Sequence, residues 1–244
     1  MTSNQGVTGS TPVWGAKTLS FLSLMDKKYN TLIFDTDGTL LDSLRDILSA
    51  VNAALKQCGY EKEYSYKEGF ALIGSGAHEL ARRALSFAKA SEDEFTKFEK
   101  LFFANYAKNQ GKTTEPFEGL TDLLIKFKEK GYRLFIASNK PHYLLNEIID
   151  AKFPKDLFED WIGQIPGNKI KPDPFILNVL IRKYNLDLKR CLYIGDSEID
   201  VKTAINAKMD VCLVTFGYGK YTRELLAEAD YVVNNIEELG TLLI

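Results

Sequence analysis

The stretch TLIFDTDGTLLDS, residues 31–43, decides the fold of this 244-residue chain. It opens with four apolar or β-branched residues and turns abruptly polar at Asp35. A short run of this kind is typical of a strand buried on both faces of a parallel sheet. Similar runs recur at 133–137, 191–194, 211–216 and 231–233. Helical patterns lie between and after them, at 120–130, 141–151, 174–184, 200–207 and 222–229. The alternation predicts an α/β fold with helices on both faces of the sheet.

One part of the chain interrupts this alternation. From Ser43 onward the patterns stay helical for some 70 residues, beginning with an amphipathic run at 43–57. Ser91 to Glu94 has the form of a capping box and opens another such run. We expect a small all-helical cap, inserted after the first strand. The expected parts are a core at 26–42, the cap at 43–115 and the rest of the core at 116–244.

The first residues differ from everything after them. The segment 1–23 is rich in Ser, Thr and Gly and carries one charged residue, Lys17. Its apolar piece is short and follows no basic leader, which disfavours a secretory signal. We expect 1–25 to be a leader or a disordered extension; an organelle transit peptide is disfavoured because the segment lacks Arg.

The composition of the chain disfavours several classes of partner and site. Lys and Arg number 31 against 33 for Asp and Glu, and no long basic run occurs, so neither a nucleic-acid partner nor a membrane surface is expected. The cysteines Cys58, Cys191 and Cys212 are too few and scattered for a disulfide framework or zinc site. No apolar stretch approaches the length of a membrane helix. We expect a cytoplasmic protein, and the sequence leaves its oligomeric state open.

Polar residues gather where the predicted strands end. They are Asp35 and Asp37 after the first strand, Ser138 and Asn139 after the second, and Asp196 after a later one. Ligands of open parallel sheets bind beyond these carboxyl ends. Lys171 lies just before a helix, and Asp200 follows Asp196 by four residues, so that one helical turn could return it to the same place.

That collection of side chains suits phosphoryl transfer. Clustered carboxylates repel one another, and Mg²⁺ with oxygen ligands relieves the repulsion. A cation and Lys171 can neutralise phosphate oxygens, and the Ser138 hydroxyl can donate to another. One carboxylate can attack phosphorus while a second, two residues on, protonates the leaving oxygen.

The same residues resemble known motifs. Residues 34–43 resemble the first motif of the haloacid-dehalogenase superfamily. The second, third and fourth motifs are similar to Ser138-Asn139-Lys140, Lys171-Pro172-Asp173-Pro174 and the segment 195–200, in the family's order. The helical insertion is similar to the cap of the phosphoglycolate-phosphatase-like branch, and Ile73-Gly74-Ser75-Gly76 to its substrate-facing loop.

The resemblance implies a Rossmann-like core and a role for each motif residue. Asp35 would be the nucleophile that forms an aspartyl-phosphate, and Asp37 the general acid/base. Ser138, Asn139 and Lys171 would bind the phosphoryl group. Mg²⁺ would be held by Asp35, the Asp37 carbonyl and Asp196, with Asp200 acting directly or through water.

The resemblance also points to residues that would select the substrate. They are Gly74, Ser75, Gly76 and His78, which follows the glycines where related enzymes often carry Arg. His78 would contact the distal group of the substrate or be an ordinary surface histidine. His142 lies inside a predicted helix and is expected to be structural.

The predicted function is Mg²⁺-dependent hydrolysis of a small phosphomonoester, such as a phosphoglycolate-like compound, a nucleotide or a sugar phosphate. Asp37 favours a phosphatase, since dehalogenases of the superfamily lack an acid there. A phosphotransferase or mutase on the same scaffold is the first alternative. A non-catalytic phosphate-binding or signalling protein is the second, although receiver domains lack a cap and carry their acceptor after a later strand.

Overall fold

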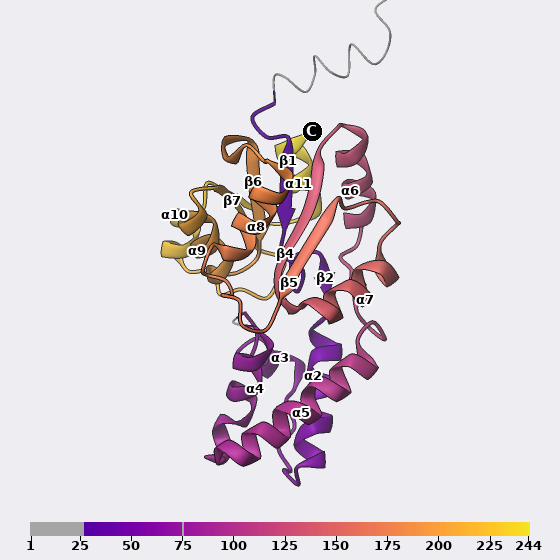
Figure 1. Ribbon diagram of the computed structural model, residues 1–244, viewed down its shortest axis with the longest axis vertical. Coiled ribbons are helices and arrows are strands. Elements are labelled where there is room, and N and C mark those ends of the chain that lie inside the picture. The colour runs from indigo at the N-terminus through magenta and orange to yellow at the C-terminus, as the bar shows by residue number, and fades with distance from the viewer. Residues whose placement is uncertain (1–26, 75) are drawn as a thin grey trace, which may run out of the picture.

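The computed structural model describes residues 27–74 and 76–244, so the expected leader at 1–25 lies outside the described residues. A six-stranded parallel sheet forms the centre of the larger part, in the order β5-β4-β1-β6-β7-β8 (Figure 1). The strands are β1 (Thr31–Phe34), β4 (Arg133–Pro141), β5 (Asp160–Gln164), β6 (Cys191–Gly195), β7 (Asp210–Val214) and β8 (Tyr231–Val233). This arrangement confirms the predicted α/β fold.

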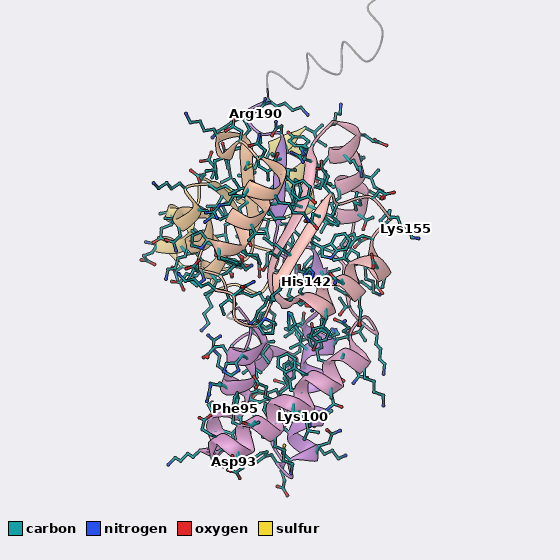
Figure 2. The ribbon with its side chains drawn as sticks, viewed as in Figure 1. Asp93, Phe95, Lys100, His142, Lys155 and Arg190 are labelled. Atoms are coloured by element: carbon teal, nitrogen blue, oxygen red, sulfur yellow. The ribbon has the colours of Figure 1, made fainter. Side chains whose placement is uncertain are left out.

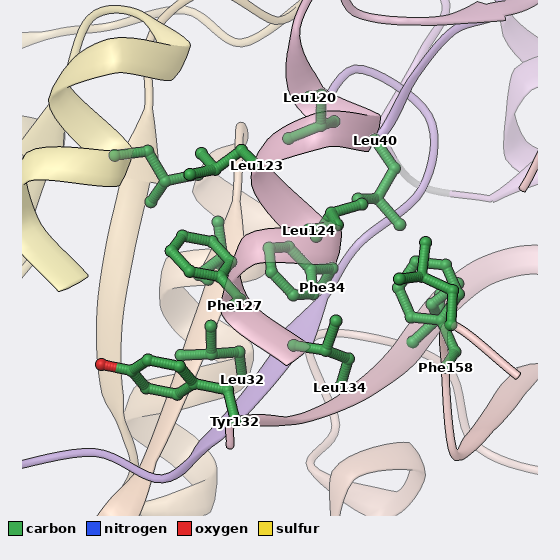
Figure 3. Close-up of a cluster of buried hydrophobic side chains, with 14 of the residues drawn as sticks. Leu32, Phe34, Leu40, Leu120, Leu123, Leu124, Phe127, Tyr132, Leu134 and Phe158 are labelled. Atoms are coloured by element: carbon green, nitrogen blue, oxygen red, sulfur yellow. The ribbon is translucent and has the colours of Figure 1, made fainter. Parts of the chain in front are cut away.

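Helices cover both faces of the sheet. On one face lie α6 (Leu120–Glu129), α7 (His142–Lys152) and α11 (Ile236–Leu243); on the other lie α8 (Phe175–Tyr184), α9 (Glu198–Ala207) and α10 (Arg223–Glu228). A short 3₁₀ turn, η2 (Leu188–Arg190), precedes β6. Because side chains alternate along a strand, Leu32 and Phe34 of β1 pack against α6 (Figure 3). Ile33 packs on the opposite face of the sheet. All three are fully buried, and each such side chain contributes about 1.5–3 kcal/mol.

The remaining helices form a separate cluster beyond the carboxyl ends of the strands (Figure 1). They are α2 (Leu44–Gln57), α3 (Tyr66–Gly69), α4 (Ala77–Leu85), the turn η1 (Ser86–Ala88) and α5 (Glu92–Asn109). They share an apolar core that includes fully buried Phe98 and Phe102. Asp93, Phe95 and Lys100 lie toward the end of this cap farthest from the sheet (Figure 2). The predicted capping box is present, since Ser91 and Glu94 each accept a hydrogen bond from the other's main-chain N–H.

Two connections join the cap to the core. They run antiparallel as β2 (Leu41–Asp42) and β3 (Glu115–Pro116). The buried Asp46 carboxylate of α2 clasps them, accepting hydrogen bonds from the N–H and hydroxyl groups of Thr113 and Thr114 at 2.7–3.1 Å. Burial alone would raise the pKa of Asp46, but the Thr114 and Thr113 donors outweigh it and leave that pKa below its usual value. The two connections therefore act as one joint.

The structure differs from the sequence expectations in several elements. β5 was not predicted, because its sequence DWIGQ has no apolar run and it lies at the half-buried edge of the sheet. β4 continues past Ala137 to Pro141, with a shift in its register against β5. α9 begins at Glu198 rather than Asp200, and α11 was also not predicted.

Candidate active site

Asp35, the predicted nucleophile, lies directly beyond β1. Its main-chain N–H donates to Ile194 O at 2.9 Å, which fixes it against the end of β6. Its residue exposure is 8%, and its Oδ1 lies 2.8 Å from Nζ of Lys171. A buried carboxylate thus faces a buried ammonium at the carboxyl edge of the sheet.

The ammonium group of Lys171 contacts two further polar groups besides Asp35. Its Nζ lies 2.7 Å from Asp200 Oδ1 and 3.0 Å from the Tyr193 hydroxyl. Burial disfavours the ammonium form, but Asp200 and Asp35 outweigh it and raise the pKa of Lys171 well above its ordinary value. Lys171 therefore carries its positive charge at neutral pH, next to Asp35.

Asn139 supports Lys171 rather than pointing a free amide at the site. Its Nδ2 donates to Lys171 O at 3.1 Å, and its Oδ1 accepts from Lys171 N at 2.8 Å. Both ends of the amide thus contact the main chain of Lys171, and the expected phosphate-binding role of Asn139 stays a prediction. Ser138 lies beside it within β4, is buried, and lines the same pocket as Asp35.

Three carboxylates meet at this point. Oxygens of Asp35, Asp196 and Asp200 lie within 4.8 Å of one another. Burial raises the pKa of Asp35 to about 6, with Lys171 opposing the rise and Asp200 adding to it. Burial, followed by the charges of Asp200 and Asp35, raises the pKa of Asp196 well above its usual value. This mutual repulsion in an all-oxygen site fits a hard divalent cation such as Mg²⁺.

The Asp200 carboxylate both contacts Lys171 and takes part in the capping box of α9. Its Oδ1 accepts from Lys171 and from the Tyr193 hydroxyl, and its Oδ2 accepts from the N–H and hydroxyl of Ser197 in a capping box for α9. A carboxylate oxygen has about two lone-pair sites, so protein donors already occupy both oxygens.

The backbone approaches Asp196 closely at two glycines. A Cβ atom at Gly38, whose φ is +89°, would lie 2.4 Å from Asp196 Oδ2, and one at Gly217 would lie 2.5 Å from it. The N–H of Tyr218, the residue after Gly217, donates to the same Oδ2 at 2.6 Å. This loop was not predicted to belong to the site. The feature that could have indicated it is a tyrosine flanked by two glycines, directly after a predicted strand.

Asp37 has its own partners. Its Oδ1 accepts a 2.6 Å hydrogen bond from Ser43 Oγ and lies 3.2 Å from Lys140 Nζ. Ser43 occupies the N-cap position of α2, but its side chain makes no capping bond, and the Tyr218 hydroxyl accepts from Ser43 N and Leu44 N in its place. Lys140 had been noted only as part of a motif.

A cavity of about 280 Å³ lies between core and cap. The core lines it with residues predicted to be catalytic (Asp35 and Asp37), phosphate-binding (Ser138 and Lys171) or metal-binding (Asp196). The cap lines it mainly with apolar side chains: Ile47, Phe70, Ile73, Leu80, Phe102 and Tyr106. Gly74 and Gly76 also border it, whereas Ser75 lies outside the described residues.

Helix α4 explains which of its residues reach the cavity. Ala77, Leu80 and Arg83 are three residues apart, share one face and all line it. His78 lies on another face, where its Nδ1 is 2.5 Å from Glu99 Oε1 and Arg82 donates to its Nε2. The structure therefore does not bring His78 to the cavity and brings Arg83 there instead.

His142 lies in the core near its boundary with the cap (Figure 2). Its Nδ1 accepts a hydrogen bond from Gly163 N at 3.1 Å, which links α7 to β5. This agrees with its expected structural role. Separately, among the helices of residues 27–74 and 76–244, none combines the length and apolarity that a membrane crossing needs.

Comparison with known proteins identifies the family. The model of the haloacid dehalogenase-like hydrolases matches residues 32–214. A phosphoglycolate phosphatase of Vibrio cholerae is 31% identical over 222 residues, spanning 89% of this chain and 96% of the relative. One of Psychrobacter arcticus is 34% identical over 209 residues, or 82% and 90% of the two chains.

A solved structure agrees with these relatives. A predicted phosphoglycolate phosphatase from Haemophilus somnus superposes with a TM-score of 0.82 at 28% identity, covering 89% of this chain and 99% of that one. These comparisons confirm the prediction of an enzyme of the phosphatase type. The chain belongs to the haloacid dehalogenase-like hydrolase family.

Proposed function

We propose that the protein is a Mg²⁺-dependent phosphatase that hydrolyses a small phosphomonoester through an aspartyl-phosphate on Asp35. The observation that carries this proposal is the position of Asp35, which faces Lys171 at 2.8 Å and shares an oxygen cluster with Asp196. A nucleophilic carboxylate, a fixed ammonium and a cation site are the parts that phosphoryl transfer needs.

The metal would be held by Asp35, the main-chain carbonyl of Asp37 and Asp196. Because protein donors engage both oxygens of Asp200, we propose that Asp200 acts on the metal through water. When bound, Mg²⁺ supplies positive charge to the phosphoryl oxygens and offsets the repulsion between the carboxylates.

The chain's own residues then perform two displacements. An oxygen of Asp35 attacks phosphorus while the bond from phosphorus to the leaving oxygen breaks, and Asp37 donates a proton to that oxygen. A water molecule next attacks the aspartyl-phosphate, Asp37 takes its proton, and Asp35 and inorganic phosphate are released. Lys171 and Ser138 neutralise and orient the phosphoryl oxygens throughout.

Phosphoglycolate is the substrate we propose first. The curated relatives carry that activity in their names. The cavity is small for a ligand site, which suits a compact metabolite. Arg83 is the one charged side chain that the described part of the cap brings to the cavity lining, and a guanidinium suits a carboxylate on the leaving group.

Phosphate release tests the proposal directly. We expect Mg²⁺-dependent release from phosphoglycolate, abolished by Asp35→Asn and preserved in Asp173→Asn, a matched change outside the cavity lining. Nucleoside monophosphates, sugar phosphates and pyrophosphate complete the substrate panel. Less phosphate than substrate consumed would indicate a transferase or mutase. Release unchanged by Asp35→Asn would refute the mechanism.

The compartment is also a proposal. Cys58, Cys191 and Cys212 are free thiols, two of them buried, as expected in a reducing cytoplasm. Cell fractionation with a compartment marker checks this, and recovery of the protein outside the cytoplasmic fraction would contradict it.

A further inference from the structure

A buried lysine to which the proposed mechanism gives no role lies next to the proposed general acid/base. Lys140 comes from the end of β4 and has a residue exposure of 5%. Its Nζ is 3.2 Å from Asp37 Oδ1 and 3.4 Å from Asp37 Oδ2. Burying an ammonium group away from water costs free energy unless polar partners compensate for it. The groups that contact the Lys140 ammonium therefore indicate its role.

The second partner of this ammonium comes from the cap. Nζ of Lys140 donates to the hydroxyl of Tyr106, which lies near the carboxyl end of α5. Tyr106 is itself buried and stacks on Phe102, with ring centroids 5.8 Å apart and an interplanar angle of 12°. Both aromatic side chains line the cavity. A residue anchored in the cap core therefore contacts the lysine that contacts Asp37.

The contacts also distinguish the two oxygens of Asp37. The Ser43 hydroxyl and the shorter Lys140 contact both fall on Oδ1. Among the described residues, Lys140 approaches Oδ2 at the longer distance of 3.4 Å. Oδ2 is thus the oxygen that can exchange a proton with the leaving group or with water.

We propose that Lys140 and Tyr106 are positioning residues that hold Asp37 for proton transfer and make its placement depend on the seating of the cap. Core, joint and cap each contribute one contact to this arrangement, through Lys140, Ser43 and Tyr106. When α5 moves away, Lys140 loses its hydroxyl partner and Asp37 loses part of its support. This inference rests on the proposed function, in which Asp37 protonates the leaving oxygen as its bond to phosphorus breaks.

The dependence of kcat/KM on the leaving group distinguishes a positioning role of Lys140 and Tyr106 from a merely structural one. Benzyl phosphate has a poor leaving group that needs a proton, whereas 4-nitrophenyl phosphate has a good one that hardly does. The ratio kcat/KM covers the steps up to departure of the leaving group and excludes the later attack by water. Loss of Asp37 positioning lowers kcat/KM selectively for benzyl phosphate, while a misplaced cap lowers it for both.

The variants are Tyr106→Phe, which removes one oxygen atom from a buried ring, and Lys140→Met. Matched controls are Tyr64→Phe, whose hydroxyl bonds to Ala84 O elsewhere in the cap, and Lys152→Met, whose ammonium pairs with Glu115. We expect Tyr106→Phe to lower kcat/KM about tenfold for benzyl phosphate and less than about twofold for 4-nitrophenyl phosphate. Lys140→Met has the larger effect in the same direction, and the controls change neither value.

The variant Asp37→Asn distinguishes failure of the acid role of Asp37 from failure of the positioning role of Lys140 and Tyr106. If this variant lowers kcat/KM for benzyl phosphate by about 10²–10⁴ and spares 4-nitrophenyl phosphate, the acid role of Asp37 stands. Equal losses for both substrates in Tyr106→Phe and Lys140→Met would then overturn the positioning role alone. If Asp37→Asn itself shows no preference between the substrates, the acid step fails, and the positioning role fails with it.

Discussion

The main-chain N–H of Tyr218 donates a 2.6 Å hydrogen bond to Oδ2 of Asp196, one of the proposed metal ligands. The side chain of the same tyrosine reaches the joint between core and cap. Its hydroxyl donates to Asp42 Oδ1 at 2.7 Å and accepts from Ser43 N at 2.6 Å and Leu44 N at 3.1 Å. One residue thus ties the metal site to the first turn of α2.

Tyr218→Phe is expected to weaken this joint. The substitution leaves Asp42 and the first amides of α2 without their hydroxyl partner, and losing buried hydrogen bonds of this kind costs about 1–3 kcal/mol. Chemical denaturation measures the loss of unfolding free energy. Tyr143→Phe, at a half-exposed ring, is the control. Equal stability of the two variants would contradict the role assigned to the Tyr218 hydroxyl.

Mg²⁺ is expected to raise the melting temperature of the substrate-free protein. Ligands that bind only the folded state stabilise it by mass action, and here the cation also relieves repulsion among Asp35, Asp196 and Asp200. A thermal melt with and without chelator measures the shift. Asp196→Asn is expected to abolish it. A shift that persists in Asp196→Asn would place the metal elsewhere.

Acid is expected to weaken the clasp at Asp46. The folded-state pKa of this carboxyl lies below its unfolded value of about 3.9, so its stabilisation is present above that value and is lost as pH falls through the folded pKa. Asp46→Asn should therefore lose less unfolding free energy than wild type between about pH 5 and pH 2. Parallel curves for the two proteins over this range would contradict the assignment.

Removal of the Asp46 side chain is a separate and harsher change. Asp46→Ala leaves the donors of Thr113 and Thr114 unsatisfied and is expected to cost at least about 3 kcal/mol, measured by urea denaturation at neutral pH. A cost below about 1 kcal/mol would show that water replaces the carboxylate readily.

Arg83→Met is expected to discriminate between substrates. If the guanidinium binds the carboxylate of phosphoglycolate, its loss lowers kcat/KM for that substrate about ten- to hundredfold and leaves 4-nitrophenyl phosphate nearly unchanged. Arg82→Met is the matched control, since Arg82 does not line the cavity and its guanidinium pairs with Glu92 at the start of α5. Equal effects on both substrates would assign Arg83 to supporting the Leu72 and Ile73 carbonyls that it also contacts.

Local pattern was enough to predict most of the core. The apolar run of β1 ends at Asp35, and parallel strands bring their carboxyl ends to one edge, so the sequence alone predicted that Asp35, Ser138 and Asp196 lie together. β5 was not predicted, because an edge strand needs no continuous apolar sequence.

Contacts between distant segments could not be read in the same way. Tyr106 meets Lys140 only because the cap folds back onto β4, and nothing in either local sequence encodes that approach. The choice between His78 and Arg83 depended on the rotation of α4, which the glycine motif before it does not fix. The residues that sequence reasoning missed are therefore those that join the cap to the core.

The most direct test of the central claim is detection of phosphate on Asp35 itself. Asp37→Asn is incubated with 4-nitrophenyl phosphate and Mg²⁺, because a good leaving group allows the first displacement while loss of the base slows the second. After an acid quench and borohydride reduction, peptide mass spectrometry identifies the modified residue. The account predicts homoserine at position 35, dependent on Mg²⁺. Turnover with residue 35 unmodified, or modification at another carboxylate, would contradict it.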